Sequence, residues 1–331
     1  MEKNMHRETD TDLSKSKRKI WKTSLIFFTL LIILCINLAA LAIGGIIYEE
    51  TSILPTYSHP RTNYRLLQPL KYGDNTLDNE DITIESRYGY TLSATFISNP
   101  TPTTKTLVFL HGFMGNRSIG LNYLDLYMQS GFNLLLVDSR AHGESGGNSV
   151  TWGNYEKYDL DQWIHWVSQR FPRGIIGIHG ISMGAATALM HAELNESNKR
   201  VAFYIADSSY SDLETLLAIQ MEQRLGFSGT RLPKILLQYA NVVAYCNSGF
   251  TFHQSSPIRS VRNVTTPILY IHGESDELVP SYMSAALYNA TKGPRQIYLF
   301  PHTGHIAAIS SDPQRYSKIV KDFISSAGQH N

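Results

Sequence analysis

The hydrophobic pattern of the chain begins with one long run that carries no charge. Residues 23–48, TSLIFFTLLIILCINLAALAIGGIIY, contain no Asp, Glu, Lys or Arg. As a helix rising ~1.5 Å per residue, the run would be roughly 39 Å long, more than the ~30 Å of bilayer hydrocarbon. The pattern therefore predicts a transmembrane anchor. A cleaved signal peptide is the alternative, because Ala40-Leu41-Ala42 resembles a cleavage site, but the run exceeds the usual signal core of about 7–15 residues.

The charges beside this run predict its orientation. Residues 1–22 are polar, and a basic cluster lies at their end: Lys15, Lys17, Arg18, Lys19 and Lys22. Only Arg61 and Arg65 follow the run closely. Because basic residues are enriched on the cytoplasmic side of a span, we expect a cytoplasmic tail over residues 1–22. The remainder of a single-pass protein would then lie outside the cell membrane.

Beyond the run, the pattern changes twice. Residues 49–80 contain three prolines and no clear period, so we expect a linker or a strap over the domain surface. From Asp81, the segments DITIESR and TLSATFIS alternate like half-buried strands, and Tyr88-Gly89-Tyr90 joins them. This arrangement predicts a β-hairpin at the start of a folded domain.

After the hairpin, apolar strand-like runs alternate with helical stretches. The strands are TLVFLHG, NLLLVDS, IIGIHGIS, VAFYIADSSY, PILYIHGES and QIYLFP. Helices are expected near residues 118–130, 155–171, 183–194 and 313–326. This alternation is typical of an α/β domain with a mostly parallel sheet covered by helices on both faces. We therefore predict one such domain over residues 81–328, with an eight-stranded sheet.

One connection is longer than a simple crossover requires. Residues 211–266 separate two predicted strands and show helical apolar spacing in LETLLAIQMEQRL and KILLQYANVVAY. We expect a helical cap insertion at about 211–262, lying above the strand ends. The apolar residues of the cap are expected to form its own core rather than a substrate wall: Leu216, Leu217, Ile235 and Leu236.

Composition narrows the function classes. The chain has 331 residues, 43% of them hydrophobic, and a formal net charge of +1, with no basic stripe outside its beginning. A nucleic-acid partner is therefore not expected. The two cysteines are Cys35, inside the apolar run, and Cys246, so no disulfide is predicted between them. His302 and His305 have no third ligand cluster near them in the sequence, so we predict neither a metal site nor a cofactor.

Candidate chemistry begins at GIHGISMGAA, where Ser182 lies between Gly180 and Gly184 at a strand-to-helix turn. Gly and Ser are common turn residues, so this pattern alone leaves a purely structural interpretation open. A nucleophile needs such a turn, because glycines remove the side chains that would crowd it. Asp276, in ESDELVP, and His305, in PHTGH, each follow another strand. The carboxyl ends of parallel strands meet at one edge, so we expect the three side chains to converge.

Several motifs together resemble the α/β-hydrolase fold of the serine hydrolase type. They are HGFMGN, DSRAHGESGG, GISMGA, HGESDELVP and GHIA, supported by TWGNYEKYDLDQWIHWV. The resemblance covers roughly residues 81–328. It is greatest to single-pass cell-surface hydrolases of Gram-positive bacteria that are related to dienelactone hydrolases and acylaminoacyl peptidases.

The resemblance implies a role for each site residue. Ser182 would be the nucleophile, His305 the base, and Asp276 the acid that orients the base. Backbone N–H groups of Phe113 and Met183 would form the oxyanion hole. His302 and Glu274 are the rivals for base and acid. We expect four further polar residues to organise loops rather than to react: His111, Asp138, Arg140 and His142.

The predicted function is extracellular hydrolysis of a carboxylic ester or related acyl bond (EC 3.1.1) through an acyl-enzyme, without a cofactor. A peptidase of the acylaminoacyl type is the enzymatic alternative. The Met-Gly-Ala that follows Ser182 differs from the Tyr-Gly-Gly of prolyl-oligopeptidase-like enzymes and disfavours it. A silent, membrane-tethered binding protein is the third possibility. The partners predicted are a small ester or acyl substrate and the membrane. Substrate identity and oligomeric state do not follow from the sequence.

Overall fold

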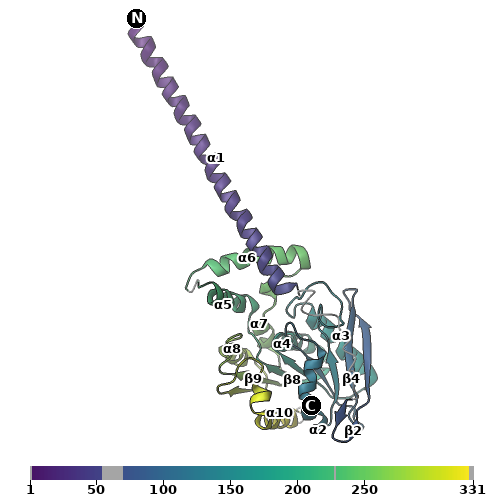
Figure 1. Cartoon of the computed structure of the whole chain (residues 1–331). Helices are drawn as coiled ribbons and strands as arrows, with labels where there is room; N and C mark the ends of the chain where they lie inside the picture. Colours follow the sequence, from purple (N-terminus) through teal and green to yellow (C-terminus); the bar gives the residue numbers. More distant parts are fainter. Residues whose placement is uncertain (1, 54–69, 227–228, 328–331) are drawn as a thin grey trace.

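An eight-stranded sheet forms the centre of the domain in the computed structural model, which describes residues 2–53, 70–226 and 229–327 (Figure 1). The strand order is β10-β9-β8-β7-β5-β6-β4-β3. Two strands at one edge of this sheet, β3 (Asn79–Glu85) and β4 (Thr91–Ile97), pair antiparallel, and β4 also runs antiparallel to β6. The others are parallel: β5 (Thr106–Leu110), β6 (Asn133–Val137), β7 (Ile176–Ile181), β8 (Val201–Asp207), β9 (Ile268–Gly273) and β10 (Arg295–Phe300). The predicted hairpin and mostly parallel sheet are confirmed.

Helices cover both faces of this sheet, which explains why the central strands read as continuous apolar runs. One face packs against α3 (Glu156–Arg170), α4 (Met183–Asn195) and α8 (Tyr282–Ala290), with Trp163 and Leu189 in its core. The other face packs against α2 (Leu124–Gln129), α9 (Ala308–Ser311) and α10 (Pro313–Ala327). A small two-stranded sheet, β1 (Lys71–Tyr72) and β2 (Asn75–Thr76), precedes β3.

The helix predicted near residues 118–130 is only half α-helical. Its first part is the 3₁₀ segment η1 (Arg117–Tyr123), and the α-helix begins at Leu124. The Asn116 side chain accepts a hydrogen bond from the Ser118 N–H at 2.9 Å and so caps the start of the 3₁₀ segment. Gly120 lies so close to the sheet that an added Cβ would come within 2.6 Å of the Leu136 side chain. The 3₁₀ segment therefore packs directly against β5 and β6.

Two helices form the cap above the carboxyl ends of the strands (Figure 1). They are α5 (Leu213–Leu225), which begins at the N-cap Asp212, and α6 (Leu232–Ser248), which ends at Gly249 with φ +68°. Shorter segments return the chain to the sheet: η2 (Phe252–Gln254), α7 (Pro257–Ser260) and η3 (Val261–Asn263). Of the residues predicted for the cap core, Leu216, Leu217 and Leu236 are buried. Ile235 is not, since it is 52% exposed on the outer side of α6.

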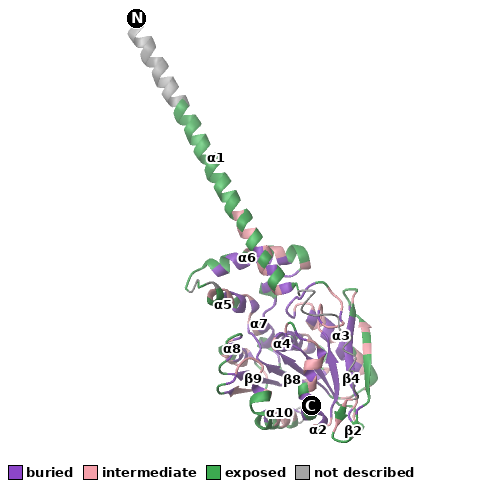
Figure 2. Ribbon diagram, in the orientation of Figure 1, coloured by how far each residue is buried: buried purple, intermediate pink, exposed green. Residues whose placement is uncertain are grey.

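The helix predicted over residues 23–48 is part of a longer one. Helix α1 runs from Glu2 to Ser52, so the polar residues before the apolar run and the first residues after it are also helical. Within the part of the chain that the structure describes, Lys17–Ser52 is the one helix long and apolar enough to cross a membrane. Its apolar side chains are exposed along most of its length (Figure 2).

The C-terminal part of α1, called its base below, packs across α6 (Figure 1). Gly44 permits the close approach, because an added Cβ would lie 2.7 Å from the backbone carbon of Tyr239. The Tyr239 hydroxyl donates to Asn37 Oδ1 at 2.7 Å, and Trp152 Nε1 donates to the Thr51 carbonyl at 3.1 Å. The cap and the base of α1 therefore share one apolar core, which includes the buried Tyr48.

Candidate active site

Ser182 occupies a strained turn between β7 and α4. Its backbone has φ +52° and ψ −118°, a conformation that is costly for any residue except glycine. A Cβ on Gly180 would lie 2.2 Å from the Gly184 carbonyl oxygen, and one on Gly184 would lie 2.3 Å from that of Leu110. Both glycines are therefore required by backbone crowding, as the functional interpretation of the motif supposed.

The three predicted side chains converge in one hydrogen-bonded chain. His305 Nε2 lies 2.9 Å from Ser182 Oγ, and His305 Nδ1 lies 2.6 Å from Asp276 Oδ2. Because the carboxylate can only accept, Nδ1 carries the proton, and Nε2 is left to accept the serine O–H. The three residues follow the carboxyl ends of three strands of the sheet, β7, β9 and β10, with β8 between β7 and β9. This arrangement can transfer the serine proton to the imidazole.

Asp276 is held as a carboxylate by a full set of donors. Its Oδ1 accepts the N–H groups of Leu278 at 3.0 Å and Val279 at 2.8 Å. Burial alone would raise the pKa of Asp276, but hydrogen bonds from His272, from His305 and from the Val279 N–H outweigh it. The pKa of the carboxyl therefore lies well below its usual value, and the group stays charged beside the base.

His272 is a second histidine on Asp276 that sequence reasoning did not single out. It is fully buried, and its Nε2 lies 3.0 Å from Asp276 Oδ2 and 2.8 Å from the Val279 carbonyl oxygen. Both neighbours are acceptors, so Nε2 carries the proton and Nδ1 accepts the Ser284 hydroxyl at 2.7 Å. The available signal was its place four residues before Asp276, inside the motif HGESDELVP.

The residues predicted to supply the oxyanion donors belong to two segments next to Ser182. Met183 is the first residue of α4, where the first N–H groups of a helix have no intrahelical acceptor. Phe113 follows Gly112, and a Cβ on Gly112 would be 3.3 Å from Ser182 Cβ and 3.8 Å from its Oγ. The loop after β5 therefore touches the serine. The Phe113 ring stacks on that of Trp152, with 4.7 Å between the ring centroids, and this contact holds the loop against the cap core.

The other polar residues of the family-like motifs organise loops, as expected. Asp138 accepts the Arg117 backbone N–H at 2.7 Å and its guanidinium at 2.9 Å. His111 Nε2 accepts the Ser139 N–H at 3.0 Å, and His142 Nε2 accepts the Met114 N–H at 3.2 Å. These hydrogen bonds connect the loops after β5 and β6 behind the site.

Two rivals for the site roles lie away from the hydrogen-bonded chain. His302 and Glu274 are both exposed. Among the described residues, no group of three or more His, Cys, Asp or Glu side chains is placed to hold a metal ion.

Asp207 and Ser208 form a buried support beneath the site that the sequence pattern did not reveal. The Asp207 carbonyl accepts the Ser182 N–H at 2.8 Å, and Ser208 Oγ accepts the Ile306 N–H at 3.2 Å. The Asp207 carboxyl accepts the hydroxyls of Ser208 and Tyr316, each at 2.9 Å. Burial raises the pKa of Asp207. The end of β8 is thus hydrogen-bonded both to Ser182 itself and to Ile306, the residue after His305.

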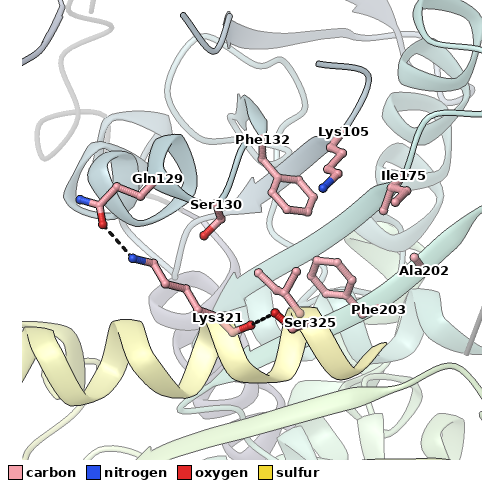
Figure 3. Close-up of a pocket in the computed structure, with 10 residues that line it drawn as sticks. Lys105, Gln129, Ser130, Phe132, Ile175, Ala202, Phe203, Lys321 and Ser325 are labelled. Carbon is pink, nitrogen blue, oxygen red and sulfur yellow. Dashed lines mark hydrogen bonds between the residues drawn. The ribbon is translucent and has the colours of Figure 1, made fainter. Parts of the chain in front are cut away.

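Three hollows in the described part of the chain differ in their relation to this site. A cleft of about 1010 Å³ reaches Phe113 and Met114 and is bounded by the base of α1 and the end of α6. A smaller pocket of about 540 Å³ lies at the amino ends of the strands, between α2 and α10 (Figure 3). There Lys321 reaches across to Gln129, with Nζ 2.7 Å from Oε1. This pocket is at the opposite end of β7 from Ser182. A third hollow, of about 460 Å³, is lined by Ile181 and Ile306, the residues next to Ser182 and His305.

Comparison with known proteins agrees with this architecture. The model of the alpha/beta hydrolase family matches residues 107–319. An uncharacterized protein, YqkD of Bacillus subtilis, is 32% identical over 73% of this chain and 77% of its own length. YfhR of Escherichia coli K12, also uncharacterized, is 26% identical over 77% of this chain and 84% of its own.

Among solved structures, the Pyrococcus furiosus esterase Pf2001 superposes with a TM-score of 0.60 at 23% identity, covering 78% of this chain and 99% of the esterase. Acetyl xylan esterase 1 of Thermoanaerobacterium sp. JW/SL YS485 has a TM-score of 0.55 at 15% identity, covering 77% of this chain and 86% of its own. At these identities the likeness shows the fold. Since the family model and the Bacillus relative both span most of the chain, the chain belongs to the alpha/beta hydrolase family.

Proposed function

We propose that this protein is a serine hydrolase that cleaves a carboxylic ester, or a related acyl bond, through an acyl-enzyme. The observation that carries the proposal is the hydrogen-bonded chain from Ser182 through His305 to Asp276, on a strained turn at the carboxyl ends of the strands. Esterases among proteins of the same fold support the choice of an ester.

The geometry suggests the following steps. Ser182 Oγ attacks the carbonyl carbon while His305 Nε2 takes its proton, and Asp276 stabilises the resulting imidazolium. The N–H groups of Phe113 and Met183 would stabilise the tetrahedral oxyanion, each by about 3 kcal/mol of barrier. His305 then gives its proton to the leaving alcohol. Water, activated by the same histidine, releases the acid and restores Ser182.

Helix α1 is proposed as an uncleaved membrane anchor, with the domain outside the cytoplasmic membrane. The length and composition of Lys17–Ser52 support the span, and the basic cluster of residues 15–22 supports the orientation. Mass spectrometry of the protein purified from its own membranes would detect residues 1–42 if the anchor is retained. Protease digestion of intact cells from which the wall has been removed should degrade the domain. Full protection would reverse the topology.

A fluorophosphonate probe tests the chemistry, because it reacts covalently with an activated serine. The full-length protein should be labelled, and Ser182→Ala should not. A panel of activated esters and N-acylated peptides would then separate an esterase from a peptidase. Labelling of a folded Ser182→Ala protein would assign the nucleophile to another residue and end the proposal for Ser182. No labelling of the folded wild type would end the serine hydrolase proposal and favour a silent binding protein.

A further inference from the structure

Helix α6 carries large apolar side chains on both of its long faces, although the outer one also exposes Lys234 and Gln238. Its inner face is buried in the cap core through Leu236, Leu237, Ala240 and Ala244. Its outer face, defined here by Leu232, Ile235, Val242 and Tyr245, is 39%, 52%, 53% and 64% exposed. Lys234 is its one charged residue, and it has no acidic residue. Scattered apolar side chains are normal on a protein surface, but here they align on one face of one helix.

The position of this face relative to α1 indicates what covers it. Along α1, large apolar side chains from Ile20 to Leu38 are exposed. Their ~19 residues would span roughly 28 Å, close to the ~30 Å thickness of bilayer hydrocarbon. The contact with α6 begins near Leu38, at the hydrogen bond between Asn37 and Tyr239, and Ile43 and Ile46 beyond it are still 42% and 56% exposed. In Figures 1 and 2, α6 accordingly lies across the base of the exposed part of α1.

Aromatic residues lie at both ends of that stretch. Trp21 is 69% exposed at one end, and Tyr245 is 64% exposed on α6 at the other. Trp and Tyr are enriched at the level of the lipid headgroups, where an apolar ring and a polar edge are both accommodated. A helix that carries apolar side chains in this plane can bury them at the boundary of headgroups and acyl chains. The same apolar face would be less favourable in free energy if it were exposed to water.

The cleft beside α6 is lined by residues of the two packed helices, such as Tyr48 and Val243, and by Phe113, whose backbone N–H is a predicted oxyanion donor. Its lining combines apolar side chains, such as Ile53, with charged ones, such as Glu50 and Arg224. Such a mixed lining suits a molecule with an acyl chain and a polar group.

We propose that the outer face of α6 rests in the interfacial layer of the bilayer that α1 crosses, and that the adjoining cleft admits acyl esters dissolved in that layer. The inference rests on the proposed anchor and serine chemistry. It adds a substrate class, which is an ester with a long acyl chain presented by a lipid surface. A water-soluble short-chain ester would reach the serine without using this face.

The position of α6 can be tested without any turnover. Full-length protein is reconstituted in vesicles of phosphatidylcholine and phosphatidylglycerol (3:1). The fluorophore NBD is attached to the exposed Cys246 in a Cys35→Ser background. Doxyl-labelled phosphatidylcholine should quench this fluorophore. NBD at Ile175→Cys, in a chain without the natural cysteines, should not be quenched, because Ile175 is 40% exposed at the far end of β7.

NBD at Cys35, in a Cys246→Ser background, reports on the anchor itself. Quenching at Cys35 but not at Cys246 would overturn the proposed position of α6. Absence of quenching at both would overturn the anchor and this proposal together. Oxidative cross-linking of Cys246 to Cys246 between two chains, without lipid quenching, would assign the face to a second copy and also overturn it.

The substrate class is tested with two esters of one fluorescent alcohol. Wild type and Ile235→Ser/Val242→Ser are compared in the same vesicles on 4-methylumbelliferyl palmitate and 4-methylumbelliferyl butyrate. The variant should lose at least tenfold in kcat/KM on the palmitate and stay within twofold on the butyrate. The control Ile175→Ser should change neither. Equal loss on both esters, or no loss on either, would overturn the proposed entry route. Failure of the wild type on both would instead count against the serine hydrolase itself, while the quenching would still locate α6.

Discussion

Ser182 carries both the candidate chemistry and a local cost in stability. Its φ of +52° and ψ of −118° lie in a region that glycine adopts more readily than any other residue. We expect Ser182→Gly to be more stable than Ser182→Ala by about 1 kcal/mol, and to be as inactive. Urea unfolding of the two variants side by side measures the difference. Equal stabilities would mean that the turn is not strained.

The kinetic effects of the three residues should be strongly non-additive. Ser182→Ala and His305→Ala should each reduce kcat for an activated ester by on the order of 10⁵-fold or more, and combining them should add little. Asp276→Asn should cost less, on the order of 10⁴-fold, because this residue orients the base without taking its proton. Full activity in a folded His305→Ala protein would assign the base to another histidine, His302 first.

Asp276 also predicts a pH dependence of stability. Its pKa is lowered in the folded state, where burial is outweighed by hydrogen bonds from His272 and His305. Its contribution is therefore complete above the unfolded pKa of ~4 and is lost as pH falls toward the lower, folded value. The stability gap between wild type and Asp276→Asn should narrow by about 1 kcal/mol between pH 5 and pH 3. A gap that stays constant over this range would contradict the assignment.

At the scale of elements, two adjacent glycines on α1 offer a matched pair. A Cβ on Gly44 would lie 2.7 Å from the Tyr239 backbone, whereas one on Gly45 would meet nothing within 4 Å. Both substitutions to alanine favour the helix by about 1 kcal/mol, but only Gly44→Ala forces α1 away from α6. We expect Gly45→Ala to be more stable than Gly44→Ala by roughly 1–3 kcal/mol. Thermal melts of the full chain in nanodiscs compare them, and equal melting temperatures would argue that the two helices do not pack.

The sequence predicted most elements because their signals are local. The alternating hairpin, the apolar central strands and the crowded glycines around Ser182 each leave a pattern in a few consecutive residues. Asp207 and Ser208 left none, because their roles depend on distant partners such as Tyr316 and Ile306, and the place of His272 in HGESDELVP did not reveal its contact with Ser284. The packing of α1 on α6 was also invisible, since an all-apolar run indicates a span but not its neighbour. Ile235 was misplaced for the same reason, because an apolar residue on α6 does not reveal which of two apolar faces it occupies.

At the scale of the whole molecule, the end of α1 is part of the domain. Tyr48 and Ser52 are 5% and 0% exposed, and the Ser52 carbonyl accepts the Val150 N–H at 2.8 Å. A chain that lacks residues 1–36 should stay in the supernatant without detergent, because the long exposed apolar stretch is gone. A chain that lacks residues 1–52 should have a melting temperature at least about 5 °C below that of the chain that lacks residues 1–36, because the cap core loses Tyr48. Identical melting temperatures would show that α1 contributes nothing to the fold.

Helix α1 continues without a break from its exposed apolar stretch to the contact with the cap. A flexible linker would let a domain adopt many distances and tilts relative to a surface. A continuous helix that packs against the domain restricts it to a narrow range of both. If α1 crosses the membrane as proposed, the distance between Ser182 and the lipid headgroups would be set by the length of this continuous helix. On the proposed function, substrate would then reach the serine within one plane, and turnover would depend on the surface density of substrate in the membrane rather than on its concentration in the surrounding water.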